Sequence, residues 1–310
     1  MISYIVPIYN SEKTIASCLE SILAQNVEKE ILAIDNNSSD KSAEIIKKYP
    51  VKYFCEMKRG PAAAKNKGLK ELSHASTYVA FVDSDVVLPN DWTIKALKLL
   101  EKHAGVCGVG GHGKSIIMNS ASEIFDNLLY GKNANQRDAI VKSLATMDVM
   151  YRKESISNMF FNEKLIAAED PDFNFRLNQK NYKLLYSSEL WVYHHNPTRI
   201  MIAMKKWFNY GKFYPLPYFL NNELMDLGLW IRLLYAPIII ISLFYGIMTG
   251  NALPISISFL LMPLSYFIIA IKSRILNPNK LYIFIIFHTL KQWSQIAGIW
   301  YGFLTKLKRT

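Results

Sequence analysis

Two groups of acidic residues stand directly after apolar, β-rich runs in the first third of the chain. Asp35 ends the run EILAID and Asn37 follows it, whereas Asp83 and Asp85 follow the run YVAFV. A carboxylate at the end of a strand can accept hydrogen bonds from the donor edge of a planar base. Two carboxylates at i and i+2 can bind a hard divalent cation together with diphosphate oxygens. Asp170 and Asp172 repeat the i, i+2 spacing elsewhere, so the position at a strand end is what distinguishes the first pair.

Three further groups carry possible chemistry nearer the middle of the chain. Glu169 and Asp170 stand at the start of a predicted helix. The helix dipole stabilises acidic residues there, which is sufficient to explain both. A carboxylate at this place could also act as the general base that deprotonates an attacking hydroxyl. His194 and His195 end the run WVYHH; a neutral imidazole could complete a metal site, and strand alternation lets only one of the two face it. Lys65 lies in the small-residue segment KRGPAAAKNKG, which suits an anion or, equally, a solvated basic helix.

Alternating patterns in residues 2 to 112 predict the elements that position these groups. Short β-rich runs are each followed by helix-period stretches, which indicates βαβ units and a mainly parallel sheet. The expected strands are residues 2–9, 30–36, 51–55, 78–85 and 105–111. Ligands of such sheets bind at the carboxyl ends of the strands, which is where the acidic groups stand. We expect residues 113–200 to complete the same domain, with helices at 121–131 and 171–179 and strands at 148–152, 183–186 and 190–194.

Charge and hydropathy separate the last third of the chain from the rest. Residues 1–200 hold 25 of the 36 Lys and Arg and 23 of the 25 Asp and Glu, a net charge of +2, so the remaining +9 belongs to residues 201–310. These bases border long apolar runs rather than forming a soluble basic face, which argues against a nucleic-acid partner. Cys18, Cys55 and Cys107 have no metal-ligand spacing and are expected to be buried, reduced thiols.

The apolar run predicts attachment to a membrane. Residues 233–271 contain no charged residue for 39 positions, about twice the ~20 residues of one helical crossing. We expect crossings near residues 229–248 and 253–271, with a turn at residues 249–251. A third segment, residues 281–304, either lies in the interface or spans as a third helix, because it contains His288, Lys291 and Gln292. The flanking bases, together with the absence of a signal-peptide pattern in residues 1–9, predict a multi-pass protein of the cell membrane with a cytoplasmic catalytic domain.

The order of the motifs resembles that of the family-2 glycosyltransferases with the GT-A fold. That family has a V-P-x-Y-N strand, an Asp-rich turn, an A-A-x-N-x-G helix, a D-x-D, a glycine-rich loop, an E-D pair and a C-terminal His. The matching segments here are Val6–Asn10, Asp35–Asp40, Ala63–Gly68, Asp83–Asp85, Gly108–Gly113, Glu169–Asp170 and His194. The resemblance covers residues 2 to about 215 and implies an α/β, Rossmann-like nucleotide-diphospho-sugar transferase fold, followed by a C-terminal transmembrane helical hairpin. It therefore divides the chain into a catalytic domain, residues 1–215, and a membrane region, residues 216–310.

By position, the resemblance also implies roles for individual residues. Those implied to hold the nucleotide sugar are Pro7, Asn10, Asp35, Asn37, Lys65 and Asp83, with Lys65 near the diphosphate. Asp83, Asp85 and His194 would hold Mn²⁺ or Mg²⁺, and Asp170, beside Glu169, would take the acceptor proton as the sugar is transferred with inversion. Two positions depart from the family pattern, because Asn158 and Asn181 stand where Gly is frequent. We interpret both as loop substitutions.

The expected function is transfer of a sugar from a nucleotide-diphosphate sugar, with UDP favoured, to a polyprenyl-linked acceptor at the bilayer. Lys205 and Lys206, in a basic aromatic segment, could meet the acceptor's phosphate or anionic lipid. Two alternatives stay open: a polyprenyl-phosphate monosaccharide synthase, whose ionised nucleophile needs no base, and a catalytically silent membrane scaffold of the same fold. The sequence predicts neither the sugar nor the oligomeric state.

Overall fold

The computed structural model describes the chain except for residues 117–119, 131–137, 197, 273–274, 276 and 308–310. The chain divides into two compact units. The first consists of Met1–Ile116 and Tyr130–His195, and the second of Ile117–Leu129 and Asn196–Thr310. This division differs from the expected boundary at residue 215, because residues 196–215 and 117–129 belong to the second unit.

The first unit is built on a mixed sheet. The parallel part has the order β3-β2-β1-β4 and consists of β1 (Ile2–Ile8), β2 (Lys29–Asp35), β3 (Lys52–Cys55) and β4 (Tyr78–Val82). The other strands are β5 (Val86–Val87), β6 (Val106–Ser115), β7 (Ala139–Val141), β8 (Asp148–Arg152) and β9 (Lys183–His194). β8 lies between β4 and β6 and is antiparallel to both, β6 and β9 are parallel, and β5 and β7 are antiparallel to β9. The expected parallel sheet is therefore parallel in its first half and mixed beyond β4.

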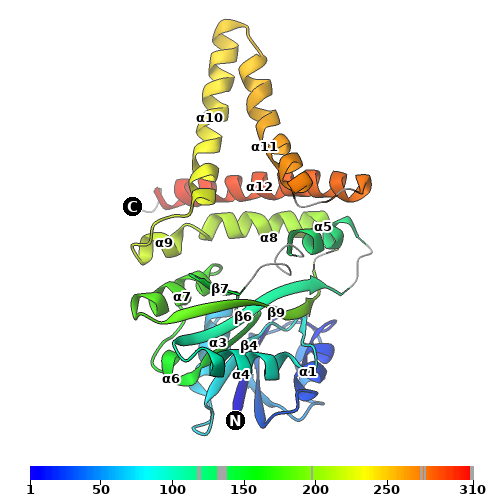
Figure 1. The fold of residues 1–310 in the computed structure, drawn as a ribbon, viewed down its shortest axis with the longest axis vertical. Helices are drawn as coiled ribbons and strands as arrows, with labels where there is room; N and C mark the ends of the chain where they lie inside the picture. The colour runs from blue at the N-terminus through cyan, green and yellow to red at the C-terminus, as the bar shows by residue number, and fades with distance from the viewer. Residues whose placement is uncertain (117–119, 131–137, 197, 273–274, 276, 308–310) are drawn as a thin grey trace. The chain divides into compact units, whose positions relative to one another are not determined.

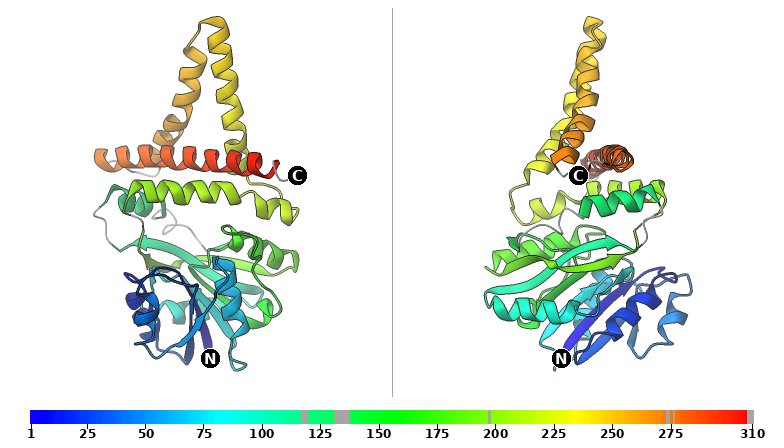
Figure 2. Two further views of the ribbon diagram at one scale, coloured as in Figure 1. Left: turned by 180° about the vertical axis from the view of Figure 1, so that it is seen from behind. Right: turned by 45° about the vertical axis from the view of Figure 1, so that its right-hand side comes forward.

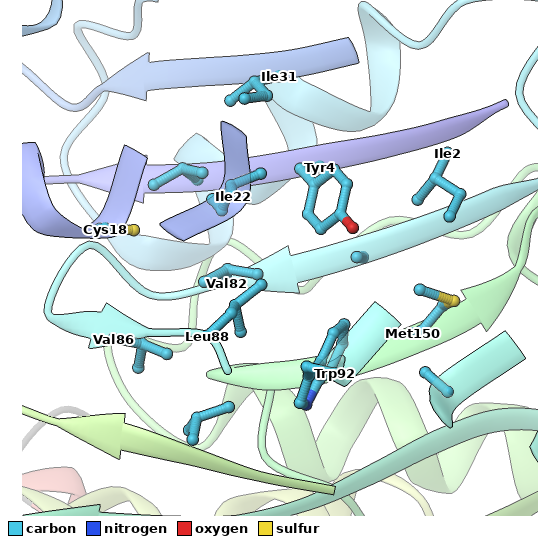
Figure 3. Close-up of a cluster of buried hydrophobic side chains, with 14 of the residues drawn as sticks. Ile2, Tyr4, Cys18, Ile22, Ile31, Val82, Val86, Leu88, Trp92 and Met150 are labelled. Carbon is cyan, nitrogen blue, oxygen red and sulfur yellow. The ribbon is translucent and has the colours of Figure 1, made fainter. Parts of the chain in front are cut away.

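Helices cover both faces of this sheet, which is why its strands are apolar on both sides. The helices are α1 (Ile15–Leu23), α2 (Ser42–Ile46), α3 (Pro61–Lys70), α4 (Trp92–Lys102), α6 (Lys153–Ile156) and α7 (Glu169–Gln179). One core, drawn in part in Figure 3, joins α1, α2 and α4 to residues such as Tyr4 and Met150. The other core joins α3, α6 and α7 to residues such as Ile5 and Tyr151. Neighbouring residues of one strand thus supply opposite cores.

The second unit is helical (Figures 1 and 2). Its helices are α5 (Ala121–Tyr130), α8 (Ile200–Phe213), α9 (Leu216–Leu220), α10 (Leu227–Thr249), α11 (Leu253–Lys272) and α12 (Pro278–Leu307). α8 and α12 lie side by side in all views. Their backbones meet at glycines: an added Cβ would stand 2.1 Å from Phe208 O at Gly298 and 2.1 Å from Gln295 O at Gly211.

α10 and α11 form the expected apolar hairpin. Leu227–Thr249 and Leu253–Ile271 are long and apolar enough to cross a membrane, and in each of them under a fifth of the most apolar window is buried. The left-handed Gly250 ends α10, as glycine favours at a helix C-terminus. The third expected segment is one continuous helix, α12, and it does not meet the same criterion within the described residues.

Most predicted elements agree with the structure to within a few residues, but four details differ. The two strands expected at residues 183–186 and 190–194 are one strand, β9, whose pairing with β6 shifts register. Residues 83–85 lie outside β4, and the short strands β5 and β7 were not expected. Finally, Cys18 and Cys107 are buried as expected, but Cys55 is exposed. That prediction was wrong because β3 is the edge strand of the sheet.

Candidate active site

The carboxyl ends of β1 and β2 bring together the first group of predicted residues. Asp35 is paired with Ile8 in the register of the two strands, so the segment after β1 starts next to it. The buried Asp35 carboxylate accepts hydrogen bonds from Ser38 N at 3.1 Å and from Tyr53 Oη at 3.0 Å. Tyr53 was not predicted, because it lies on β3 and nothing near it in the sequence indicates this contact.

Asparagines shape the loops at this edge. Asn10 and Asn37 have φ values of 51° and 57°, in the left-handed region that asparagine tolerates better than most residues. Asn10 Oδ1 accepts a hydrogen bond from Ser39 N at 2.8 Å, and Asn10 N donates to Ser38 Oγ at 3.0 Å. These bonds tie the loop after β1 to the loop after β2. Pro7, which is partly buried in β1, stands opposite Ile34 in the register.

Asp83 and Asp85 follow β4, and β9 supplies the histidine. β5 starts directly after Asp85 and pairs Val86 with His194. The His194 side chain is buried, and its Nε2 lies 3.4 Å from Asp85 Oδ2. His195 instead donates from its backbone N to Asp85 O at 2.9 Å. Of the two histidines that the sequence left open, His194 is therefore the one whose side chain faces the aspartate.

β6 lies against β9 closely enough to require glycine. A Cβ at Gly111 would stand 1.3 Å from Leu190 O, a distance that no side chain could accept. The expected glycine-rich loop, Gly108 to Gly113, is therefore part of a strand. Its glycines allow the close approach that sets His194 beside Asp85 at the end of β9.

Lys65, Glu169 and Asp170 form a buried ion-pair cluster. Lys65 Nζ, on α3, lies 2.7 Å from Glu169 Oε1 and 2.7 Å from Asp170 Oδ1, at the start of α7. Only 3% of the Lys65 side chain and 9% of the Glu169 side chain are exposed, against 23% for Asp170. Asp170 is thus the member of the cluster that solvent or a ligand can reach.

Thr146 holds the Asp170 carboxylate from the other side. Thr146 Oγ1 donates to Asp170 Oδ1 at 2.7 Å, and Thr146 N donates to Asp170 Oδ2 at 3.1 Å. A carboxylate offers about four lone-pair positions, and among the described residues three are used, two of them on Oδ1. Oδ2 therefore keeps capacity for one further donor, such as a hydroxyl.

The residue before the pair is strained. Ala168 has φ 66° and ψ 21°, a left-handed conformation that costs a non-glycine residue roughly 1–2 kcal/mol. Such conformations concentrate at functional sites, where the surrounding structure enforces them. Here the strained residue is the N-cap of α7, and it sets the direction in which Glu169 and Asp170 enter the helix.

Charge couples the two groups of acids. Burial alone would lower the pKa of Lys65, but Asp170, Glu169 and Asp83 raise it well above the ordinary value, so the ammonium stays charged. Loss of hydration raises the pKa of Asp83 to about 6; Lys65 opposes this rise, while Asp85 and Asp170 add to it. Loss of hydration also raises the pKa of Glu169, against the effect of Lys65. Negative charge therefore exceeds positive charge here, which favours a cation.

The residues present fit a divalent ion in part. The described residues contain no cluster of three or more His, Cys, Asp or Glu side chains that could hold a metal. Asp85 Oδ2 and His194 Nε2 are nevertheless close enough to bind one ion, and a carboxylate oxygen with an imidazole nitrogen suits Mn²⁺. Mg²⁺-type sites commonly take one or two carboxylates from the protein and the rest from phosphate and water.

Comparison with known proteins identifies the family. The model of "Glycosyl transferase family 2" matches residues 3–160, half of the chain and the part that carries β1 to β8. The chain belongs to glycosyl transferase family 2. This confirms the family that the order of the motifs predicted, and it makes the protein a glycosyltransferase.

Two relatives within family 2 show the range of its members. The chain is 26% identical over 197 residues to a poly-beta-1,6-N-acetyl-D-glucosamine synthase of Staphylococcus epidermidis. The matched residues make up 60% of this chain but only 47% of that protein. The chain thus spans about half the length of that relative. It is also 26% identical over 235 residues, 68% of this chain and 71% of the other, to a dolichyl N-acetyl-alpha-D-glucosaminyl phosphate 3-beta-D-2,3-diacetamido-2,3-dideoxy-beta-D-glucuronosyltransferase of Methanococcus voltae.

Solved structures support the GT-A fold. The mannosyltransferase PcManGT from Pyrobaculum calidifontis, in complex with GDP-Man and Mn²⁺, has a TM-score of 0.63 at 15% identity and covers 98% of this chain and 87% of its own. TarS of S. aureus, residues 1–349 in complex with UDP, has a TM-score of 0.51 at 17% identity, and the match covers 100% of this chain and 92% of the TarS chain. At these identities the likeness establishes the fold alone.

Proposed function

We propose that the protein is a membrane-bound inverting glycosyltransferase that moves a sugar from a nucleotide-diphosphate sugar, with UDP favoured, to a polyprenyl-linked saccharide. The observation that carries this proposal is the exposed edge of Asp170, fixed by Lys65 and Thr146 and electrostatically coupled to Asp83. A single displacement requires a base in a fixed position. It also requires a bound cation that pairs with the diphosphate, and the neighbouring acids are suited to binding such a cation.

The nucleoside end of the donor would lie at the carboxyl ends of β1 and β2. There, Asp35 would accept from the N–H of the base, since its oxygens have capacity beyond Ser38 N and Tyr53 Oη. Pro7, Asn10 and Asn37 would line the same edge, and Asp83 would contact the ribose. A uracil and a guanine both present an N–H to such a carboxylate, so the expected preference for UDP does not follow from this contact. The two structural neighbours cover both possibilities, because TarS is in complex with UDP and PcManGT with GDP-Man.

Asp170 would act as the general base. The acceptor's hydroxyl oxygen forms the new bond to the anomeric carbon as the bond from that carbon to the diphosphate oxygen breaks, and the hydroxyl proton passes to Asp170 Oδ2. Nucleoside diphosphate leaves with the bonding electrons. Attack from the face opposite the leaving group inverts the anomeric carbon, and one base is enough for one displacement.

A bound metal ion and the Lys65 ammonium would have separate roles in this step. Asp85 and His194 would hold Mn²⁺ or Mg²⁺, which when bound neutralises charge on the departing diphosphate. Lys65 has a different part, because its ammonium contacts Glu169 and Asp170 rather than standing free. It would hold the Asp170 carboxylate in position before the reaction. The diphosphate contact that the resemblance implies for Lys65 would require the ammonium to leave one of these carboxylates.

The second unit would bring the acceptor to the membrane surface. α10 and α11 are long and apolar enough to span a bilayer, and the bases beside them would keep the first unit in the cytoplasm. Lys205 and Lys206, on α8, would meet the acceptor's phosphate. A dolichyl-phosphate-linked acceptor in the name of the M. voltae relative supports this choice of acceptor class.

Nucleotide binding tests the proposal. We expect UDP to raise the melting temperature of the detergent-solubilised protein more than GDP or CMP does, and only with Mn²⁺ or Mg²⁺ present. Asp85→Asn removes one ion ligand and should abolish the metal-dependent part. A larger shift with GDP would change the proposed donor to a GDP-sugar but would leave the proposed glycosyltransferase activity in place. No shift with any nucleotide, in protein shown to be folded, would favour the silent scaffold instead.

A further inference from the structure

A cavity in the second unit is independent of the site described above. It has a volume of about 280 Å³ and lies where the end of α8 and the short helix α9 meet α12. Its lining is apolar except at one residue: Leu216 and Phe219 come from α9, Ile299 and Phe303 from α12, and Lys212 from the last turn of α8. This volume is at the lower end of the range of ligand pockets, and it suits the end of one hydrocarbon chain.

The close helix packing explains why the cavity exists. Gly302, which also lines it, is the second glycine of the segment GIWYG, one helical turn after Gly298. A Cβ at Gly302 would stand 2.8 Å from Lys212 O, so the backbones of α8 and α12 approach each other where a side chain would otherwise fill space. Beyond this contact α8 ends at Phe213 and the chain turns through Pro215 into α9, whose side chains complete the wall.

Lys212 places one positive charge at this apolar cavity. Its Nζ lies 5.2 Å from the ring centroid of Phe213 and 5.0 Å from that of Tyr301, within the range of cation–π contacts. The side chain is partly exposed, so its ammonium can meet a ligand while the aromatic rings hold it in place. A single cation beside an otherwise apolar hollow is complementary to a molecule with an anionic head and an apolar chain.

The chain next to the cavity is apolar and exposed. Phe219, which lines the cavity, is 53% exposed, and Leu224 and Leu227, which lead into α10, are 87% and 75% exposed. Exposed apolar side chains therefore continue from the cavity into a helix that is apolar enough to cross a membrane. Such an exposed apolar surface is more stable in contact with lipid than in contact with water.

We infer that this cavity binds the hydrocarbon chain of an anionic membrane lipid, with the lipid's phosphate paired to Lys212. The inference rests on the membrane attachment in the proposed function but not on its chemistry. The lipid would seat α8, α9 and α12 at the bilayer surface, in addition to the anchoring by α10 and α11.

Photo-crosslinking in liposomes tests this site. The full chain is reconstituted with phosphatidylglycerol or phosphatidylcholine that carries a diazirine near the end of one acyl chain, and labelled peptides are mapped by mass spectrometry. We expect labelling of α9 and of the α12 segment around Ile299, about fivefold stronger with phosphatidylglycerol, since one lysine near an anionic lipid is worth a factor of that order.

Three variants separate the charge from the cavity. Lys212→Gln should reduce phosphatidylglycerol labelling to the phosphatidylcholine level, and Leu216→Trp, which fills the cavity, should remove labelling by both lipids. Lys280→Gln makes the same charge change at an exposed position at the start of α12 that does not line the cavity, and it should leave labelling unchanged.

Each contrary result overturns the inference. Equal labelling by both lipids in the wild type would remove the role of Lys212, and undiminished labelling in Leu216→Trp would mean that the lipid lies outside the cavity. Flotation of the protein with the liposomes keeps the two proposals apart. Protein that fails to float contradicts membrane attachment itself, whereas protein that floats without labelled α9 or α12 contradicts only the lipid site.

Discussion

The two compact units hold themselves together by different means. In the first unit, helices cover both faces of a sheet, and the charged Lys65 of α3 is buried between two carboxylates at the start of α7. In the second unit, α8 and α12 meet backbone to backbone at Gly211 and Gly298, and the apolar side chains of α10 and α11 are largely exposed. The first arrangement fixes charge precisely, as a reaction needs; the second presents apolar surface, as attachment to lipid needs.

The largest effect is expected when the buried charge of the first unit is removed. Lys65→Met leaves the buried Glu169 and the partly buried Asp170 without their cation, and breaking a buried pair in this way costs about 3–5 kcal/mol. We expect a loss of that size in the free energy of unfolding of the first unit. Guanidinium denaturation in detergent, followed by hydrogen exchange with mass spectrometry, measures each unit separately.

A neighbouring lysine provides the control for this variant. Lys67 lies on the same helix, and its pair with Glu71 is partly exposed at 2.8 Å. Exposed i, i+4 pairs contribute about 0.3–0.5 kcal/mol, so Lys67→Met should have little effect. If the two variants destabilise the first unit equally, the buried cluster has no special weight in its stability.

The second unit should be sensitive to volume rather than to charge. Gly298→Leu forces the α8 and α12 backbones apart, because the first added atom would already stand 2.1 Å from Phe208 O. Overpacking of this kind costs typically 1–3 kcal/mol. Ala297→Leu adds a side chain to the adjacent, exposed position and should change stability by less than about 0.5 kcal/mol. Hydrogen exchange in α8 measures the difference, and equal exchange in both variants would contradict the glycine contact.

A smaller effect should follow from a buried histidine of the sheet. Burial, with the nearby Lys114, lowers the pKa of His112 to about 4, against an ordinary value of 6.5. Between these values the unfolded chain binds more protons than the folded chain, so stability falls as the pH drops from about 6.5 toward 4. At pH 5 we expect a loss of roughly 1–2 kcal/mol from this residue.

Substitution assigns the pH dependence to the residue. His112→Asn removes the titrating group on β6 and should flatten this part of the stability profile of the first unit, measured by denaturation at several pH values. An unchanged slope in His112→Asn would show that other groups cause the acid sensitivity.

The sequence predicted the helices and strands better than the contacts between distant segments, for a physical reason. Alternating strands and helices with local capping and apolar patterns are visible in short windows, and β8 was predicted with its observed bounds, Asp148 to Arg152. Contacts between distant segments leave no such signal. Thr146 and Tyr53 therefore escaped prediction, although each holds a predicted carboxylate, and α8 was assigned to the catalytic domain although it packs along α12.

Two departures from the family pattern gain a physical explanation. Asn158 and Asn181, which stand where glycine is frequent, have φ values of 63° and 64°. Asparagine is one of the few residues other than glycine that adopts this left-handed conformation readily. The substitutions therefore keep the backbone that glycine would give, which the residue type alone could have indicated.

The central claim is that Asp170 takes the acceptor proton, and one comparison tests it most directly. Transfer of labelled sugar from a panel of UDP-sugars to a lipid extract is measured for the wild type, for Asp170→Asn, and for Asp91→Asn as an exposed acidic control in the same unit. A positioned base contributes about 10²–10⁴-fold, so we expect a loss of that size in Asp170→Asn alone, with the melting shift caused by UDP retained. Unchanged transfer in Asp170→Asn would contradict the account.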